Sequence, residues 1–436
     1  MAYEELIQEI FYRFPSVQKE GFGSRAYKPG LDGMRAFDDA LGNPSQGFKA
    51  VHVAGTNGKG SVCAMLASAC STCGLKTGLY TSPHLLDFRE RAQIDGQLIP
   101  KDYVQAFLEE WLPFAKEHDL SFFEITTGLA FKWFADEKVD IAIIETGLGG
   151  RLDSTNILPA PLLTIVTSIG LDHMQQLGNT RALIAAEKAG IFKASVPAVI
   201  GEKDPETSAV FEDKAYMLCP LHYACDTKNP VWSRRGPILE AMDLKADVQE
   251  DNLRTVLAAI ELLKEGVKQL EDNSKVVDGI IHAARNTRLR GRWETLCSSP
   301  RVIADIGHNA AALSRNFLRL ENEMESGAFS SLIIVYGVMA DKDIDAILPL
   351  MPVNATYIFA AADTPRALPA GKLVRLFNEY RRAAGLPDRC FFAGDVRQAV
   401  QMAMQLAWGD PGAFIYIGGS AYVVAQALPM FPEPGR

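Results

Sequence analysis

The stretch HVAGTNGKGS, residues 52–61, places three glycines and one lysine between an apolar run and a run of small helix-forming residues. Glycines let successive backbone N–H groups turn toward one anion, and a helix N-terminus adds partial positive charge. Lys59 would supply a mobile charge for nucleotide phosphates, and Ser61 a hydroxyl for Mg²⁺. The competing interpretation is a glycine turn with a solvated lysine. The expected nucleotide-binding residues here are Gly55, Thr56, Asn57, Gly58, Lys59, Gly60 and Ser61.

The spacing within this loop is unusual. Only two residues separate Gly55 from the Gly58-Lys59 pair, whereas the general phosphate loop is longer at this point. The loop therefore predicts phosphate binding, but its spacing does not match that of the common kinases and nucleotide switches.

Polar side chains also follow three other apolar runs. Ser82 and His84 stand in TSPHL, Glu145 ends VDIAIIE, and Asp172 and His173 follow LLTIVTSIG. A carboxylate ending an apolar strand is costly to bury unless it meets a cation, and Mg²⁺ on ATP phosphates is one such cation. Because parallel strands end at one sheet edge, we expect these groups beside the phosphate loop. A structural arginine paired with Glu145 is the alternative.

Two further groups carry weaker signals. Glu187 and Lys188 lie in a predicted helix at 185–193, where such a pair is typical of a solvated helix surface. Arg292 and Asp305 flank a predicted domain junction, from which they could hold a nucleotide in an interdomain cleft.

The elements that must position these residues form two alternating series. Runs that are continuously apolar indicate strands buried on both faces of a parallel sheet, with helices between them. The first series of predicted strands is 49–55, 76–80, 139–147, 162–170 and 196–201. The second series is 301–307, 331–337, 355–361 and 413–419.

The predicted fold is α/β, with a doubly wound, mostly parallel phosphate-loop domain and a smaller Rossmann-like α/β domain. A chain of 436 residues exceeds one typical core. We assign residues 1–293 to the larger, ATP-binding domain and 300–436 to the smaller, with WETLCSSP (293–300) as the linker.

Composition excludes several classes of function. The net charge of −9 argues against nucleic-acid binding. The seven cysteines are odd in number and irregularly spaced, which argues against a secreted disulfide framework. The apolar runs are short for a membrane span, and the predicted acidic N-terminal helix lacks signal-peptide features. We therefore expect a cytoplasmic protein that contacts neither nucleic acid nor membrane.

Together these motifs resemble the folylpolyglutamate synthase/dihydrofolate synthase family of the Mur ligase superfamily. The resemblance runs in order along nearly the whole chain through HVAGTNGKGS, TSPHL, SFFEITTGLAF, ETGLGGRLDSTN, LDHMQQLG, EKAGIFK, RGRWE, ADIGHN and GVMADKD. It implies an ATP-dependent ligase that adds L-glutamate to dihydropteroate, to the glutamate tail of (tetrahydro)folate, or to both. The reaction passes through an acyl phosphate and forms ADP and phosphate, and the family suggests a monomer.

The resemblance also implies roles for individual residues. Lys59, His173 and Lys188 match catalytic positions, and Lys188 matches a lysine that is carbamylated in the family. The magnesium ligands, for two ions, would be Ser82, Glu145, His173 and Lys188. Further nucleotide contacts would be Asn252, Arg292, Asp305 and His308. The pterin-side contacts would be Ser121, Phe122, Phe123, Glu124, Leu152, Asp153 and Ser154.

The chain departs from the family pattern at two places. SRAYKPGLDGM, before the phosphate loop, is longer than expected, and the resemblance implies a pterin contact near Leu31–Met34. In ADIGHNAAA the usual proline after His-Asn is absent. The alternatives are a folylpolyglutamate synthase alone, another Mur-type amino-acid ligase, a guanine-nucleotide switch or a binding protein with a dead active site. The guanine motif Asn-Lys-x-Asp is absent from the sequence, and the retained Lys59, Glu145 and His173 disfavour a dead site.

Overall fold

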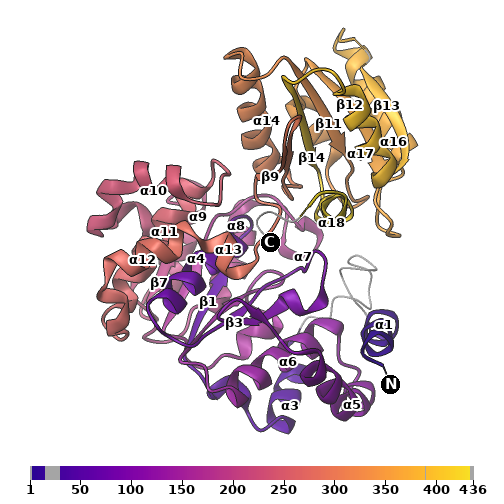
Figure 1. Ribbon diagram of the computed structural model, residues 1–436. Helices are drawn as coiled ribbons and strands as arrows, with labels where there is room; N and C mark the ends of the chain where they lie inside the picture. The colour runs from indigo at the N-terminus through magenta and orange to yellow at the C-terminus, as the bar shows by residue number, and fades with distance from the viewer. Residues whose placement is uncertain (1, 15–29, 388, 433–436) are drawn as a thin grey trace. The chain divides into compact units, whose positions relative to one another are not determined.

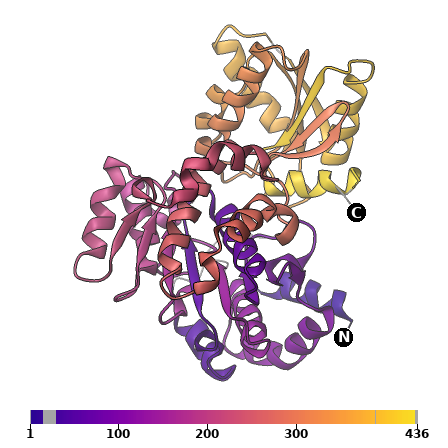
Figure 2. The same ribbon diagram turned by 60° about the vertical axis from the view of Figure 1, so that its left-hand side comes forward.

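The computed structural model describes residues 2–14, 30–387 and 389–432. The chain forms two compact units (Figures 1 and 2), Met1–Leu244 with Val248–Leu289, and Lys245–Asp247 with Arg290–Arg436. Each unit is built around its own sheet. Within the described residues, no helix combines the length and apolar character needed to cross a bilayer.

The first unit holds a mostly parallel sheet in the order β4-β3-β2-β5-β1-β6-β7-β8. Its strands are β1 (Ala50–Ala54), β2 (Thr77–Tyr80), β3 (Ala92–Ile94), β4 (Gln97–Leu98), β5 (Ile141–Glu145), β6 (Leu163–Val166), β7 (Ala198–Ile200) and β8 (Leu221–Tyr223). Only β3 and β4 run antiparallel to their neighbours. Strand β1 lies between β5 and β6, so the phosphate loop leaves the sheet near its centre.

Helices cover both faces of this sheet (Figure 1). The helices of this unit are α1 (Tyr3–Arg13), α3 (Asp32–Ala40), α4 (Lys59–Thr72), α5 (Lys101–Glu117), α6 (Phe122–Asp136), α7 (Met174–Leu177), α8 (Arg181–Lys188), α9 (Pro205–Ala215), α10 (Arg235–Ala241), α11 (Gln249–Leu263), α12 (Asn273–Ile281) and α13 (Ala283–Thr287). One core joins α4, α10, α11 and α12 to the sheet, and a second joins α1, α3, α5 and α6 to the opposite face.

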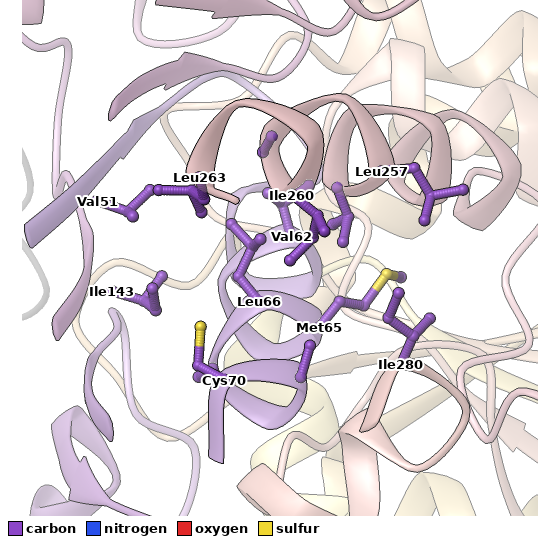
Figure 3. Close-up of a cluster of buried hydrophobic side chains, with 14 of the residues drawn as sticks. Val51, Val62, Met65, Leu66, Cys70, Ile143, Leu257, Ile260, Leu263 and Ile280 are labelled. Atoms are coloured by element: carbon purple, nitrogen blue, oxygen red, sulfur yellow. The ribbon is translucent and has the colours of Figure 1, made fainter. Parts of the chain in front are cut away.

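Helix α4 is enclosed on all sides. Every residue from Gly60 to Cys70 is buried, and Met65 and Leu66 pack among side chains of α11, α12 and the sheet (Figure 3). A helix buried all round needs small or apolar residues at every position rather than one apolar stripe. This explains the sequence SVCAMLASAC and places the helix that follows the phosphate loop in the middle of the core.

The second unit holds a six-stranded sheet in the order β13-β12-β11-β14-β10-β9. Its strands are β9 (Glu294–Ser298), β10 (Arg301–Ala304), β11 (Ser331–Tyr336), β12 (Ala355–Ala361), β13 (Cys390–Asp395) and β14 (Ala413–Gly418). Its helices are α14 (Ala310–Glu325), α15 (Ile344–Ile347), α16 (Ala370–Ala383), α17 (Val396–Leu406) and α18 (Ala421–Ala427). Aromatic contacts run from Phe317 of α14 through Tyr336 and Phe359 to Phe377 of α16 and fill one face.

The predicted α/β class and all nine predicted strands appear in the structure. Two local expectations are wrong. The predicted linker contains β9, which pairs antiparallel with β10 as part of the second sheet. The predicted helix at 185–193 ends at Lys188 and passes into a 3₁₀ turn at Ala189–Ile191. In SRAYKPGLDGM, residues 24–29 lie outside the described residues. Leu31 is the N-cap of α3, and Asp32 to Met34 begin that helix.

Candidate active site

The phosphate loop, Gly55–Gly58, connects β1 to α4 through two glycines with positive φ, +152° at Gly55 and +86° at Gly58. A Cβ at Gly55 would lie 1.8 Å from Thr167 Oγ1, and one at Gly58 would lie 2.3 Å from Asn252 Oδ1. Both positions therefore need glycine for conformation and for close approach. The structure places the predicted nucleotide residue Asn252, on α11, directly against the loop.

The segment that follows β6 holds the loop in shape. Thr167 Oγ1 donates to the carbonyl of Asn57 at 2.6 Å, and the backbone N–H of Thr56 donates to the carbonyl of Ser168 at 2.7 Å. Sequence reasoning missed Thr167 and Ser168, because the predicted strand 162–170 included both, whereas β6 ends at Val166. They form no obvious motif, because their part is to hold the loop backbone.

Two lysine amines converge on one carbonyl of the loop. Lys59 Nζ donates to the carbonyls of Gly55 at 3.0 Å and Thr56 at 3.3 Å. Lys188 Nζ, at the last residue of α8, donates to the same Gly55 carbonyl at 2.8 Å. Two lysine amines therefore stand at the carboxyl end of β1, the sheet edge where open α/β proteins bind ligands.

Lys188 is 4% exposed, so its interpretation as part of a solvated helix surface is wrong. Burial, reinforced by the charge of Lys59, lowers the pKa of Lys188 to about 7, while Asp172 and Asp153 act in the opposite direction. Its neighbour Glu187 behaves as expected of a surface residue and pairs with Arg151 at 2.8 Å. This pair joins α8 to the glycine-rich turn that follows β5.

The first turn of α4 places Ser61 among amides of α11. Ser61 Oγ accepts from Gln249 Nε2 at 3.3 Å, and Gln249 Oε1 accepts from Asn252 Nδ2 at 2.9 Å. Gln249 therefore positions both the predicted Mg²⁺-facing hydroxyl and the predicted nucleotide amide. Sequence reasoning missed Gln249 as well.

Two of the predicted metal ligands are in direct contact. Glu145 ends β5 beside Val53 of β1, is 4% exposed, and accepts from the backbone N–H of Ser82 at 3.1 Å. His173 has a positive φ of +52° immediately before α7, and its N–H donates to Asp172 Oδ1 at 2.9 Å. Within the described residues, no three His, Cys, Asp or Glu side chains gather as a metal site. A cation here would need hydroxyl and phosphate oxygens beside Glu145.

His84, the other candidate in TSPHL, has a structural environment. Its Nδ1 accepts from Arg91 Nε at 2.9 Å. Burial and the charge of Arg91 hold the pKa of His84 well below its usual range. The ring also packs edge-on against Phe11 and Phe88. His84 therefore serves the packing of α1.

The predicted pterin-side segments meet at the start of α6. Ser121 caps the helix, because its Oγ accepts from the backbone N–H of Glu124 at 3.2 Å. In return, the Oγ and the N–H of Ser121 both donate to Glu124 Oε2 at 2.7 Å. A Cβ at Gly33, in α3, would lie 2.7 Å from Glu124 Oε1, so the two predicted segments adjoin. Phe122 stacks on Phe11 at 4.7 Å. The ring of Phe123 lies against Gly147, where an added Cβ would approach it to 2.4 Å.

The remaining predicted contacts, Leu152–Ser154, lie in a turn organised by Asp153. This buried carboxylate accepts from the backbone N–H groups of Leu148 at 2.8 Å and Thr155 at 3.0 Å, and from the Thr155 hydroxyl. Burial raises the pKa of Asp153. Thr155 Oγ1 in turn accepts from His52 Nε2, on β1, at 2.8 Å. The network fastens this turn to the strand that carries the phosphate loop.

The second unit carries the other predicted nucleotide residues, Arg292, Asp305 and His308. Asp305 is buried and accepts from the N–H groups of Trp293 at 2.9 Å and Gly307 at 2.8 Å. Its burial raises its pKa. Asp305 therefore fixes the turn that presents Arg292, and His308 Nδ1 lies 3.0 Å from the carbonyl of Ile306 in the same loop. Asn309 caps α14 by accepting from the N–H of Ala312, in the stretch where the family's proline is absent.

Comparison with known protein families identifies two matching domains. Residues 53–240 match the Mur ligase middle domain, and residues 291–421 match the Mur ligase glutamate ligase domain. The dihydrofolate synthase/folylpolyglutamate synthase of Bacillus subtilis is 35% identical over 367 residues, covering 78% of this chain and 83% of the relative. A longer bifunctional relative from Haloferax volcanii is 31% identical over 415 residues, and this chain spans about half, 48%, of its length.

Solved structures agree with this assignment. Escherichia coli FolC in complex with DHPP and ADP is 27% identical, with a TM-score of 0.78 over 99% of this chain and 97% of that chain. A bifunctional folylpolyglutamate synthase/dihydrofolate synthase with Mn, AMPPNP and L-glutamate bound is also 27% identical, with a TM-score of 0.74 over 93% and 94% of the two chains. The chain therefore belongs to the folylpolyglutamate synthase/dihydrofolate synthase family of ATP-dependent Mur ligases.

Proposed function

We propose that this chain adds L-glutamate to dihydropteroate, to the glutamate tail of (tetrahydro)folate, or to both, in a reaction that consumes ATP. The observation that carries the proposal is the convergence of Lys59 and Lys188 on the phosphate loop. Relatives in the same family are bifunctional. One similar structure holds DHPP and ADP, and another holds AMPPNP and L-glutamate.

The chemistry requires two anions to meet. The substrate carboxylate attacks the γ-phosphorus of ATP, which releases ADP and leaves an acyl phosphate. The amine of glutamate then attacks the acyl carbon, and phosphate leaves as the amide forms. Lys59 and the N–H groups of the loop would offset the repulsion between carboxylate and triphosphate, and the charge that develops in the transition state.

A divalent metal fits the oxygen-rich part of the site. Magnesium prefers carboxylate, hydroxyl and phosphate oxygens, and Glu145 is a buried carboxylate in contact with the Ser82 backbone. Ser82, Glu145 and His173 would hold the metal, which when bound would neutralise phosphate charge. Ser61 is placed to present its hydroxyl at the start of α4.

We also propose that Lys188 is carbamylated. A carbamate forms when a neutral amine attacks CO₂ and releases a proton, so the pKa of about 7 at Lys188 makes the required amine available near neutral pH. The product is an anion that could help to hold a second metal ion. We expect Lys188→Ala to lose ligase activity and short carboxylates such as acetate to restore part of it. Full activity without rescue would remove the carbamate from the proposal.

The proposed function is tested with purified protein, ATP, Mg²⁺ and L-glutamate, with either dihydropteroate or tetrahydrofolate as acceptor. Mass analysis should show a product one glutamate heavier with at least one acceptor, together with stoichiometric ADP. Lys59→Ala is the inactive control. Failure with both acceptors, combined with glutamate-dependent ADP release on another carboxylate, would favour the alternative of a different Mur-type ligase.

We further propose that the protein acts as a monomer in the cytoplasm. The cysteines support the compartment, because all seven are free thiols and disulfides are rare in reducing compartments. Light scattering of the purified protein would test the oligomeric state.

A further inference from the structure

A polar cavity of about 380 Å³ lies in the first unit, away from the phosphate loop. Its floor is the C-terminal half of α4, and its walls are the beginning of β2, the turn between β3 and β4, and residues 285–288 at the end of α13. Because α4 runs from the carboxyl edge of the sheet to its amino edge, this cavity opens at the edge opposite the candidate active site. A volume of this size is within the range that accommodates small molecules.

The charges around the cavity favour an anion. Arg285 and Arg288 stand on one wall, and Asp95 on another. Asp95 Oδ1 is already occupied, since it accepts from Ser71 Oγ at 2.8 Å and from the N–H of Thr77 at 3.0 Å. Two arginines therefore line the cavity against one engaged carboxylate.

Both arginines have guanidinium N–H donors that could bind a ligand. Arg288 Nε donates to the carbonyl of Gly96 at 3.1 Å, which fixes the side chain at the rim. The backbone N–H of Arg285 donates to Asp243 Oδ2 at 2.8 Å, while its guanidinium makes no hydrogen bond with any residue that the structure describes. Planar guanidinium groups with free N–H donors match carboxylate and phosphate oxygens.

Close packing and hydrogen bonds join the walls of the cavity, so its shape exists before any ligand binds. A Cβ at Gly96 would lie 2.0 Å from the carbonyl oxygen of Asn286, which shows how closely the β3–β4 turn packs on α13. Asn286 Nδ2 donates to Ser68 Oγ at 3.0 Å, and Ser68 Oγ donates to the carbonyl of Gly279 at 2.6 Å. Helices α4, α12 and α13 are thus tied together, and they lie side by side in the ribbon diagram (Figure 1). Ligand binding would require little reordering of the chain.

We propose that this cavity is a second binding site, for a small metabolite that carries a carboxylate or phosphate group. Ser68 lies nine residues beyond Lys59 on α4, which separates the two sites by about 14 Å along the helix. The proposal does not rest on the proposed ligase activity, because none of the residues that line the cavity belongs to the candidate active site.

The test is a calorimetric titration of the full chain with inorganic phosphate and, separately, with succinate. Saturating ADP is present throughout, so that the phosphate loop is already occupied. We expect one equivalent of at least one anion to bind. Arg285→Ala and Arg288→Ala should each weaken its affinity by about tenfold or more, as loss of a charged hydrogen bond does. Arg234→Ala, which removes an exposed arginine outside the cavity, is the matched control.

A further variant keeps both arginines. Gln97→Glu adds a carboxylate at the cavity rim and should weaken the same anion several-fold. Binding of phosphate but not succinate would assign the ligand class to phosphates, and the reverse result to carboxylates. The proposal is overturned if the ADP-saturated protein binds neither anion. It is also overturned if the three cavity variants bind as Arg234→Ala does. Neither of these results would change the outcome of the ligation assay. The proposed anion site and the proposed ligase activity can therefore be refuted independently.

Discussion

The buried amine of Lys188 gives the sharpest quantitative prediction. Its pKa falls from 10.5 to about 7, first through burial and then through the charge of Lys59. A shift of this size corresponds to about 5 kcal/mol of preference for the neutral form in the folded protein. Because Lys188 is only 4% exposed, solvent screens little of this preference for the neutral amine.

The sign of the pH dependence follows from proton counting. Between about pH 7 and pH 10.5 the unfolded chain holds a proton on Lys188 that the folded chain has released. Stability therefore rises with pH in this window, by up to about 1.4 kcal/mol per pH unit. Below about pH 7 both states are protonated, and the folded protein bears the full cost of the buried charge. Lys188→Met removes this pH dependence, because methionine has a similar shape and carries no titratable group.

The assay is urea unfolding of wild type and Lys188→Met at several pH values in CO₂-free buffers, which keep the Lys188 side chain as the free amine. From about pH 7 to pH 9.5, the free energy of unfolding of wild type should rise by about 3 kcal/mol relative to the variant. Only the change of the unfolding free energy with pH is compared, because the variant also loses the hydrogen bond to Gly55 at every pH. Lys228→Met, at an exposed lysine of the same unit, should follow wild type. Parallel curves for wild type and Lys188→Met would show that the amine is not perturbed and would refute the reasoning.

Three other changes test the site. Lys59→Ala should lower kcat for ADP release by about a hundredfold or more, with an unchanged unfolding midpoint; near wild-type turnover would contradict the phosphate-loop assignment. Gly55→Ala should destabilise the protein by about 1–3 kcal/mol, whereas Gly236→Ala, in open space on α10, should be neutral or stabilising in the same denaturation series. Thr155→Val should cost about 1–3 kcal/mol and raise the KM for the pterin substrate, because it frees the turn held by Asp153; an unchanged KM would separate that turn from substrate binding.

The limits of sequence reasoning follow from physical causes. The nine predicted strands are continuously apolar because they are buried on both faces. The strands that were missed in the described part of the chain are β3, β4, β8, β9 and β13, and all except β3 form sheet edges. Edge strands need no continuous apolar pattern. In β13, for example, Phe391 and Phe392 are 46% and 58% exposed.

The residues of the candidate site likewise divide into those with a local signal in the sequence and those without one. The phosphate loop, Glu145 and Ser82 could be found because strand ends and glycines leave local signals. Lys188 could not be placed from its own helix, since its burial comes from a loop 133 residues earlier in the sequence. Thr167 and Gln249 leave no local signal because each only supports other site residues. The resemblance to a family supplied the metal and carbamate assignments, which the residues alone do not indicate.

The enclosure of α4 has a consequence for how the protein is made. The helix leaves the ribosome before the helices that cover it, because it packs against α11 and α12, and α12 ends at Ile281. About 200 residues must therefore be synthesised before its apolar surface is covered, which takes roughly 10–40 s at ordinary translation rates. During that interval the nascent chain exposes the helix that directly follows the phosphate loop. We expect this segment to be a preferred site for cotranslational chaperone binding.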